Sequence, residues 1–318
     1  MALTKRWTDW ALKLHAKTAQ AAAAVHVAGI RSLGVDPSLR TALEAADGSP
    51  YATFGSLVAG APGMTLSTSD LKTFLDQCGV AGMLVDADES HPGVVGYFQK
   101  MAAGGTRDAL GAGTHASITF SDGLLVPRRI SAAHGGTAVL EAGVVGAKID
   151  GTVPYALNEA DSLTAATYPA VSSVWTVGPV KLDATPLAGV QSVAVDFGLA
   201  LTAEAADGDL YPSVASILSI RPSIVVTSRH VDITTTLTEA GVEYAASQVV
   251  VYLRKRDEGG AYVADGTAEH VKFTLGKCRV EWATGGDPKT LTAVITPWYT
   301  AGGSPVAPLA VNTASAIT

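Results

Sequence analysis

The stretch Glu204-Ala205-Ala206-Asp207-Gly208-Asp209-Leu210-Tyr211-Pro212 has a counterpart 160 residues earlier in the chain, which reads Glu44-Ala45-Ala46-Asp47-Gly48-Ser49-Pro50-Tyr51. The match extends without a gap over residues 29–62, where 13 of 34 positions are identical to their partners 160 residues later. Internal repeats are assessed before local patterns, because a missed repeat leads to a wrong fold class. It predicts that the chain contains two diverged copies of one domain.

Weaker echoes continue the repeat beyond this stretch. His115 and His270 lie 155 residues apart, and each follows a Gly-Gly pair by the same spacing. The repeat predicts a first copy at residues 1–157, a linker at 158–169, a second copy at 170–300 and a flexible or docking tail at 301–318. Each copy then has an ordinary domain size. The alternative is two unrelated turn-rich β segments with chance matches.

Both copies are rich in short, β-branched and partly alternating runs separated by Gly, Pro and Asp-Gly turn signals, a pattern typical of antiparallel strands. Each copy also has one short helical pattern, at Ser69–Gly79 with a Ser cap and at Asp232–Ala240. Trp7, Trp10, Ala11 and Leu14 have helix-like spacing, but the corresponding part of the second copy indicates strands, so we interpret residues 10–28 as strand-like. We expect a mainly β chain with two tandem antiparallel β-sandwich or barrel domains, each with one flanking helix.

The composition limits the classes of function. Hydrophobic residues make up 47% of the chain and charged residues only 16%, below the usual quarter or so. Few surface charges suit a protein that buries much of itself against partners, although a chain rich in small residues would look similar. The net charge is −7, and no basic tract comparable to a nucleic-acid footprint is present. Met1–Trp10 has no apolar signal core, so we expect a chain that stays in the cytoplasm unless it leaves inside an assembly.

No motif predicts an enzyme, a metal site or a cofactor. Gly111–Ala116 superficially fits a dinucleotide fingerprint, but it follows no strand and opens a strand instead of a helix. Asp207-Gly208-Asp209 is better interpreted as a turn than as a Ca²⁺ loop, because further oxygen ligands are missing. Cys78 and Cys278 give no metal spacing. His115 and His270 occupy equivalent places, which favours a shared structural role, such as a side-chain bond at a strand start.

Several segments resemble the major tail tube proteins of long-tailed bacteriophages. They are Tyr97–Lys100, Gly104–Arg107, Gly123–Arg128, Val195–Leu199, Asp207–Pro212 and Ile220–Ile224. The resemblance implies two antiparallel sheets packed as a sandwich, one flanking helix, and a long hairpin that reaches the neighbouring ring. Six such domains form a tube ring, so two per chain imply a homotrimer with pseudo-six-fold symmetry. Heterologous contacts of this kind close into rings, which then stack.

The resemblance also implies partners and a location. The chain would assemble with itself and with other tail proteins in the virion, would be made in the host bacterial cytoplasm, and would bind no membrane. Double-stranded DNA would pass through without specific binding, because carboxylates lining the bore repel phosphates. Three other classes stay open: a single-ring tail-tip or terminator protein of the same fold, a β-sandwich binding module such as an adhesin, and an enzyme.

The candidate site residues are therefore contact residues between domains or rings, and ordinary turns are the alternative. They comprise the two repeated hairpin tips and one basic strand end that opens an arm to Gly260. The set is Asp47, Gly48, Tyr51, Asp207, Gly208, Asp209, Tyr211, Arg254, Lys255 and Arg256.

Overall fold

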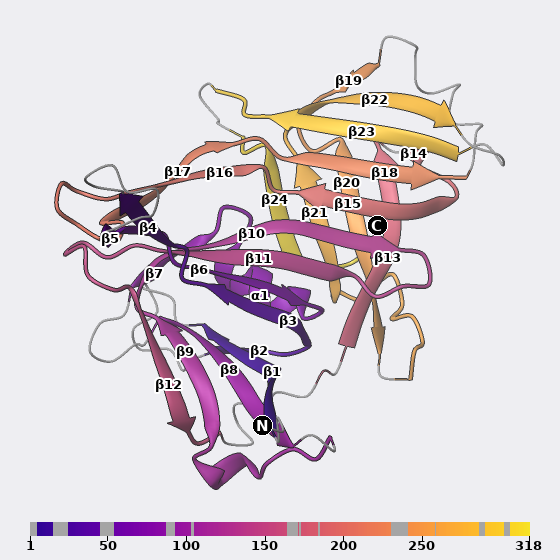
Figure 1. Ribbon diagram of the computed structural model, residues 1–318. Coiled ribbons are helices and arrows are strands. Elements are labelled where there is room, and N and C mark those ends of the chain that lie inside the picture. The colour runs from indigo at the N-terminus through magenta and orange to yellow at the C-terminus, as the bar shows by residue number, and fades with distance from the viewer. Residues whose placement is uncertain are drawn as a thin grey trace.

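The computed structural model is a mainly β molecule with two outer sheets, one long sheet that spans both halves of the chain, and two projecting hairpins (Figure 1). We call the chain up to Asp161 the first half and the chain from Ser173 the second half. The structure describes residues 5–14, 25–44, 54–86, 93–102, 105–163, 171, 173–183, 185–229, 241–257, 259–285, 290–301 and 306–318.

The first outer sheet is built by the first half and has the order β12-β9-β8-β1-β2, antiparallel throughout. Two of its five strands come from the segment whose expected structure was ambiguous, which is therefore strand at both ends. The strands are β1 (Lys5–Leu14), β2 (Val25–Val27), β8 (Val94–Ala102), β9 (His115–Phe120) and β12 (Tyr155–Asp161).

The second outer sheet is built by the second half and reads β24-β21-β20-β13-β14 from its far edge. Strand for strand, this is the order of the first outer sheet, and the pairing is again antiparallel. Its members are β13 (Ser173–Leu182), β14 (Thr185–Pro186), β20 (Val249–Asp257), β21 (His270–Leu275) and β24 (Leu309–Ser315).

The long sheet has ten strands, five from each half. The first half contributes the order β3-β6-β11-β10-β7, and the second half repeats it as β15-β18-β23-β22-β19. The first five are β3 (Ile30–Asp36), β6 (Gly63–Thr68), β7 (Met83–Asp86), β10 (Asp122–Ala133) and β11 (Val139–Gly146). The others are β15 (Val190–Asp196), β18 (Ser223–Ser228), β19 (Val242–Tyr244), β22 (Lys277–Gly285) and β23 (Thr290–Trp298).

Two antiparallel hairpins project from the same side of the long sheet, one from each half (Figure 1). The first arm is β4 (Leu39–Glu44) with β5 (Phe54–Gly60), and the second arm is β16 (Leu199–Glu204) with β17 (Val214–Ile220). A short 3₁₀ helix at Leu110–Ala112 precedes β9.

The helix α1 (Leu71–Cys78) follows β6. Asp70 caps it, since its side chain accepts a bond from the Thr73 N–H at 3.3 Å, so the expected Ser69 cap is wrong by one residue. The helix ends at Gly79, which has a φ of +59° and donates its N–H to the Leu75 carbonyl. The second expected helix, at Asp232–Ala240, lies outside the described residues.

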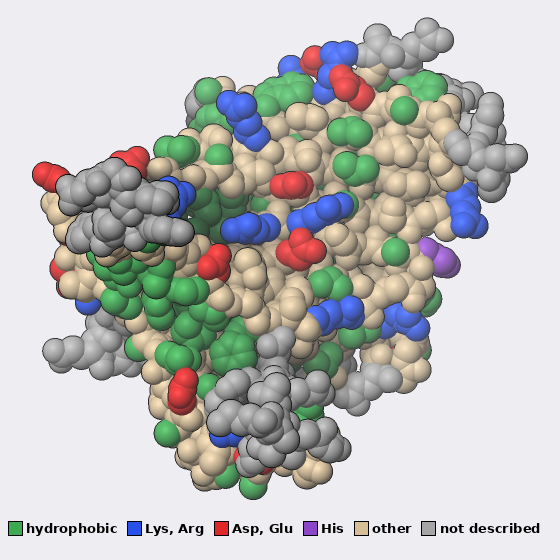
Figure 2. All heavy atoms as spheres, in the orientation of Figure 1, with side chains coloured by type: hydrophobic (Ala, Val, Ile, Leu, Met, Phe, Trp, Pro, Cys, Tyr) green, Lys and Arg blue, Asp and Glu red, His purple; other side chains and the backbone are tan. Residues whose placement is uncertain are grey.

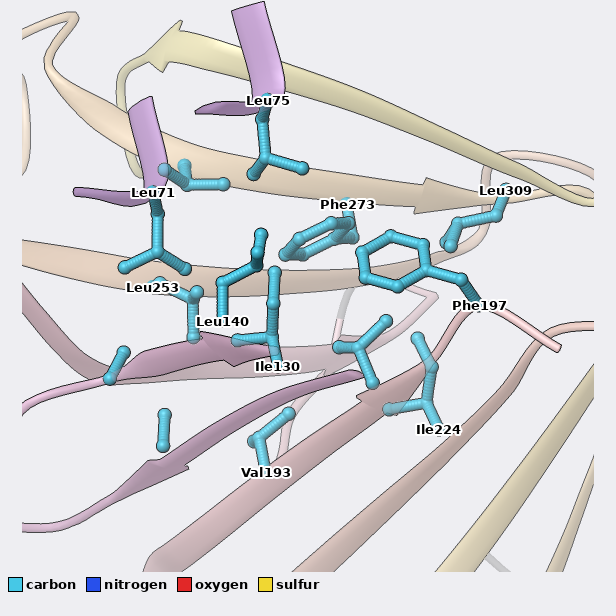
Figure 3. Close-up of a cluster of buried hydrophobic side chains, with 14 of the residues drawn as sticks. Leu71, Leu75, Ile130, Leu140, Val193, Phe197, Ile224, Leu253, Phe273 and Leu309 are labelled. Carbon is cyan, nitrogen blue, oxygen red and sulfur yellow. The ribbon is translucent and has the colours of Figure 1, made fainter. Parts of the chain in front are cut away.

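The core lies between the long sheet and the outer sheets. Buried α1 residues recur with helical spacing, at Leu71, Phe74, Leu75 and Cys78. Figure 3 shows Leu71 and Leu75 approaching Phe273 of the second outer sheet, so the helix of the first half packs on a sheet of the second half. The strands supply the other core residues, because successive side chains point to opposite faces of a sheet. In β23, for example, every second residue is buried.

The expected domain boundaries are wrong at two places. Tyr155–Asp161 is a strand paired with β9, so the first domain does not end at 157 and the linker does not begin at 158. Leu309–Ser315 is likewise a strand paired with β21, so this part of the expected tail belongs to the second outer sheet. In both cases a short strand with few large apolar residues gave a weak periodic signal.

Candidate functional site

The repeated hairpin tips are described only in the second half; Asp47, Gly48 and Tyr51 lie outside the described residues. Asp207 and Gly208 form an exposed turn in which Gly208 has a φ of +90°. The Asp209 N–H closes this turn by donating to the Ala206 carbonyl at 3.0 Å. The Asp-Gly pair therefore makes the turn that the sequence indicated.

Tyr211 and its neighbours contact the first half of the same chain. Tyr211 is buried, and a side chain at Gly60 would meet its ring at 2.7 Å. The Gly60 N–H donates to the Leu210 carbonyl at 2.8 Å, next to this contact. The Asp209 carboxylate likewise leaves no room for a side chain at Gly151. The tip of the second arm thus joins the two halves within one chain, and contact with another chain stays a prediction for its exposed turn.

The basic strand end at Arg254–Arg256 is tied to its own hairpin. Arg254 pairs with Asp265 at 2.8 Å and Lys255 with Glu269 at 2.5 Å. Both arginines lie over the Tyr262 ring, which adds cation–π attraction. The Lys255 ammonium also lowers the pKa of the exposed Glu269 carboxyl. These contacts restrain the connection between β20 and β21, and the role of this segment in assembly stays a prediction.

The two equivalent histidines make the same bonds, as the sequence indicated. His115 Nδ1 accepts from the Lys100 N–H at 3.2 Å, and its Nε2 lies 2.8 Å from the Ala109 carbonyl. His270 repeats both contacts, with Lys255 N–H at 3.0 Å and Ala264 O at 3.1 Å. Both side chains are fully buried. Because each Nδ1 accepts, each ring carries its proton on Nε2, and the expected structural role is confirmed.

The two halves meet along one line of strand pairing, between β10 and β15. The register pairs Arg129 with Asp196 and Ala133 with Ser192. The Phe197 N–H donates to the Arg128 carbonyl at 3.0 Å, and the His134 N–H donates to Gln191 O at 2.7 Å. Hydrogen-bonded pairs recur at every second residue of an antiparallel ladder, so the N–H of Val195 also faces β10. We call this pairing the internal junction.

Both members of the internal junction have an equivalent strand in the other half. Strand β3 occupies the place of β15 and pairs with β6. Strand β22 occupies the place of β10 and pairs with β19 and β23.

A groove of about 400 Å³ lies beside β3. Its walls come from β3, β8, β9 and β12 and are mostly apolar, although Glu159 also belongs to the lining. We call it the first-half groove, and the residues used below are Val35, Pro37, Phe98, Ile118, Tyr155 and Leu157. Leu157 is 58% exposed. Figure 2 shows hydrophobic side chains gathered between the arms and the first outer sheet.

Tyr155 adds a phenol group to the lining of this groove. Burial raises the pKa of its phenol, and the nearby Tyr211 raises that pKa further. The hydroxyl therefore stays uncharged at neutral pH. Its ring lies 5.8 Å from that of Phe120, centroid to centroid, which fixes it against the first outer sheet.

The equivalent surface of the second half is covered by α1. Phe197, in the place of Pro37, is buried, whereas Pro37 is exposed. The covering helix is bonded to β24: Lys72 Nζ donates to Thr313 Oγ1 at 3.3 Å, and that hydroxyl donates to the Asp76 carboxylate. The surface at Phe197 in the second half is thus covered by α1, whereas the equivalent surface at Pro37 in the first half is exposed.

Sequence reasoning missed β12 and β24, although a signal for them exists. Ala156, Asn158 and Ala160 recur as Ala310, Asn312 and Ala314, at an offset of 154 residues. In both strands the Asn side chain accepts a bond from the backbone N–H two residues later, at 3.0 Å and 2.9 Å. Three identities in five positions were too short to stand out without the structure.

The face of the long sheet away from the outer sheets carries small and polar side chains. A row in register across neighbouring strands runs Ser32, Ser67, Glu141, Arg129, Asp196 and Ser223. Acidic and basic groups alternate within this row, and Figure 2 shows both signs scattered over an otherwise neutral face. Arg129 therefore has a carboxylate on each side.

The described residues hold little chemistry of other kinds. Among them, no three His, Cys, Asp or Glu side chains are grouped as a metal ion would require. Cys78 and Cys278 are both free and buried, and burial raises the pKa of the Cys278 thiol to about 12. No helix in the described part of the chain has the length and apolar character to cross a membrane.

Comparison with known proteins adds no functional label. No protein-family model matches the chain, and no curated protein sequence matches it.

Proposed function

We propose that this protein is the structural subunit of a bacteriophage tail tube, in which three copies form a ring and rings stack into a hollow tube. The chain would then consist of two copies of one tube domain, so that three chains supply six domains. The ring encloses a bore through which double-stranded DNA passes. The proposal joins the sequence resemblance to the geometry of the long sheet.

The internal junction is the observation that carries the proposal. It is a heterologous contact, because β10 of one half meets β15 of the other. Strands β22 and β3 occupy the places of β10 and β15 in the order of the long sheet. Heterologous contacts generate rings when the rotation closes. A contact of the same kind between chains would close a ring of three copies.

The two arms support stacking of such rings. Both project from the same side of the long sheet (Figure 1) and expose large apolar side chains. These side chains are Leu39, Leu43 and Leu57 on the first arm and Val214, Leu218 and Ile220 on the second. A cluster of exposed hydrophobic residues marks an interaction surface. The apolar arms are suited to contact the next ring.

The mixed face of the long sheet suits a bore. Lysines and arginines that neutralise phosphates grip DNA by releasing counterions. Here the in-register neighbours of Arg129 are Glu141 and Asp196, and these carboxylates offset its attraction for phosphate. Small serines fill the rest of the row. A DNA duplex meets no continuous basic track on this face.

Negative-stain electron microscopy of the concentrated protein tests the proposal. We expect hollow tubes or stacked rings whose end-on averages show six lobes, and a ring mass of about three times the 32.4 kDa of one chain. Compact monomers at high concentration would contradict the proposal. Single rings that never stack would favour a tail-tip or terminator role instead.

A further inference from the structure

A charged hollow lies on the face of the long sheet away from the outer sheets. Its volume is about 580 Å³, and both halves line it, with β10 and β11 from the first half and the end of β15 and the start of β16 from the second. Figure 2 shows basic and acidic side chains gathered in the middle of this face. We call this hollow the junction pocket, and its charged residues are Arg128, Arg129, Glu141 and Asp196.

Arg128 is the charged residue of this pocket that has no cross-strand partner. The pairing of β10 with β11 passes from Pro127 directly to Arg129, so Arg128 is the extra residue of a β-bulge. Bulges re-aim side chains and are over-represented next to functional sites. Arg129 lies in register with Glu141 and Asp196, whereas no carboxylate in the described part of the chain forms an ion pair with Arg128. The charge of Arg128, which is exposed, is therefore not offset in the same way.

A glycine on the neighbouring strand makes room for the Arg128 side chain. A side chain at Gly143 would meet the Arg128 Nε at 3.0 Å and its Nη2 at 3.1 Å. The guanidinium thus lies over β11 where no side chain stands in its way. A side chain that is already restrained loses less freedom when it binds a ligand, and the planar guanidinium matches the geometry of a phosphate group.

The second half has the same strands without these charges. There β22 pairs with β23 without a bulge, so Arg128 has no counterpart. Ala283 faces Thr292 in the place where Arg129 faces Glu141. The fold therefore forms without this charged set, which favours a role in binding over a role in folding.

We propose that the junction pocket is a weak binding site for a phosphate group, with Arg128 as its anchoring cation. Charge-assisted hydrogen bonds from arginine to phosphate oxygens supply the attraction. The Glu141 carboxylate in the same pocket repels the anion and keeps the contact short-lived. The source of the phosphate rests on the proposed function, since it is the backbone of the DNA in the bore. Three chains would place three such contacts around a ring, separated by second halves that have none.

Binding of a short fluorescent DNA duplex to the unassembled chain at low salt, measured by anisotropy, tests the anchoring cation. Arg128→Gln should weaken binding about tenfold, because a hydrogen bond to a charged group is lost. It should also reduce the slope of log K against log salt by about one. The matched control is Arg40→Gln, which removes the same charge from an exposed position on the first arm. Equal losses in the two variants, or a wild-type chain that binds no duplex, would overturn the site.

Glu141→Gln gives a readout that misfolding does not imitate. It removes the repelling carboxylate and should tighten duplex binding several-fold, whereas a chain that fails to fold would bind less. Circular dichroism should show all variants folded. Unchanged or weaker binding by folded Glu141→Gln would contradict the proposed arrangement of charges.

Inorganic pyrophosphate separates the two sources of phosphate. If pyrophosphate bound to the wild type and not to Arg128→Gln while the duplex bound to neither, the site would take free phosphate and its link to the bore would be overturned. Electron microscopy keeps this result apart from the proposed function. Loss of binding with intact tubes would refute the site alone, whereas failure of the wild type to assemble would refute the tube.

Discussion

Strands β12 and β24 occupy the same place in two outer sheets of the same strand order. Strand β12 is exposed, whereas α1 covers β24. Strand β24 buries Leu309 and Thr313, while the corresponding residues of β12, Tyr155 and Glu159, are half-buried and exposed. The local pairing is equivalent in both. The difference comes from the neighbour, because only β24 has α1 against it.

This comparison teaches that exposure in the first half reflects a missing neighbour and not a different fold. The same contrast separates β3 from β15, since Val195 is buried and Val35 is partly exposed. In the proposed ring, the contact between β10 and β15 within one chain would be the template for the contact between chains.

Breaking the backbone pairing should have the largest effect. Val195→Pro removes an N–H that faces β10 in the middle of a sheet, where proline is not tolerated, and leaves a buried carbonyl unsatisfied at a cost of about 1–3 kcal/mol. We expect loss of the folded state by circular dichroism. Val35→Pro makes the equivalent change on β3, and proline is tolerated where a strand N–H faces away from the ladder. It should leave a folded monomer, measured by thermal unfolding, that forms no rings.

The conservative variant Val35→Thr separates the backbone from the side chain. It retains the N–H and the branched shape, so rings should persist in electron micrographs. If Val35→Pro assembled like the wild type, edge pairing could not be the contact between copies.

The next effect concerns the covered surface. Phe197→Ala empties a fully buried aromatic site next to Phe273, and the two ring centroids are 6.5 Å apart. Such truncations cost about 3–5 kcal/mol of unfolding free energy. The matched Pro37→Ala change lies at an exposed position and should stay within about 0.5 kcal/mol in the monomer. Denaturant unfolding of the two variants measures the difference, and equal losses would contradict the assignment of one surface as covered and the other as open.

The histidines provide the opposite test, because here the halves should behave alike. His115→Ala and His270→Ala each leave a buried N–H and a buried carbonyl without the imidazole. We expect each variant to lose about 2–4 kcal/mol, since an unsatisfied buried group costs about 1–3 kcal/mol. Thermal unfolding of both variants, compared directly, checks this. A large effect at one site and none at the other would show that the shared geometry is not a shared structural role.

The repeat predicted much of this architecture. The expected mainly β, sandwich-like class is confirmed. Short β-branched runs separated by turn signals made the strands predictable. The His115–His270 equivalence also predicted a bond that the structure contains.

The rest depended on long-range contacts that a local pattern does not encode. Strands β12 and β24 contain Ala, Asn and Glu or Thr, so propensity alone favours a loop. Their pairing with β9 and β21 overrides it. The groove could not be predicted, because it depends on which of two equivalent surfaces is covered by a helix. Tyr211 was expected at a contact between domains or rings, and its burial against Gly60 of the first half could not be derived from a local pattern.

The smallest predicted effect concerns the side-chain hydrogen bonds between α1 and β24. Thr313→Val removes a nearly buried hydroxyl that contacts both Lys72 and Asp76, and should cost about 1 kcal/mol. The control is Glu159→Gln at the equivalent exposed position, which should leave monomer stability unchanged within about 0.5 kcal/mol. Chemical denaturation resolves the pair. If both changes were neutral, α1 would be held over the second half by its apolar face alone.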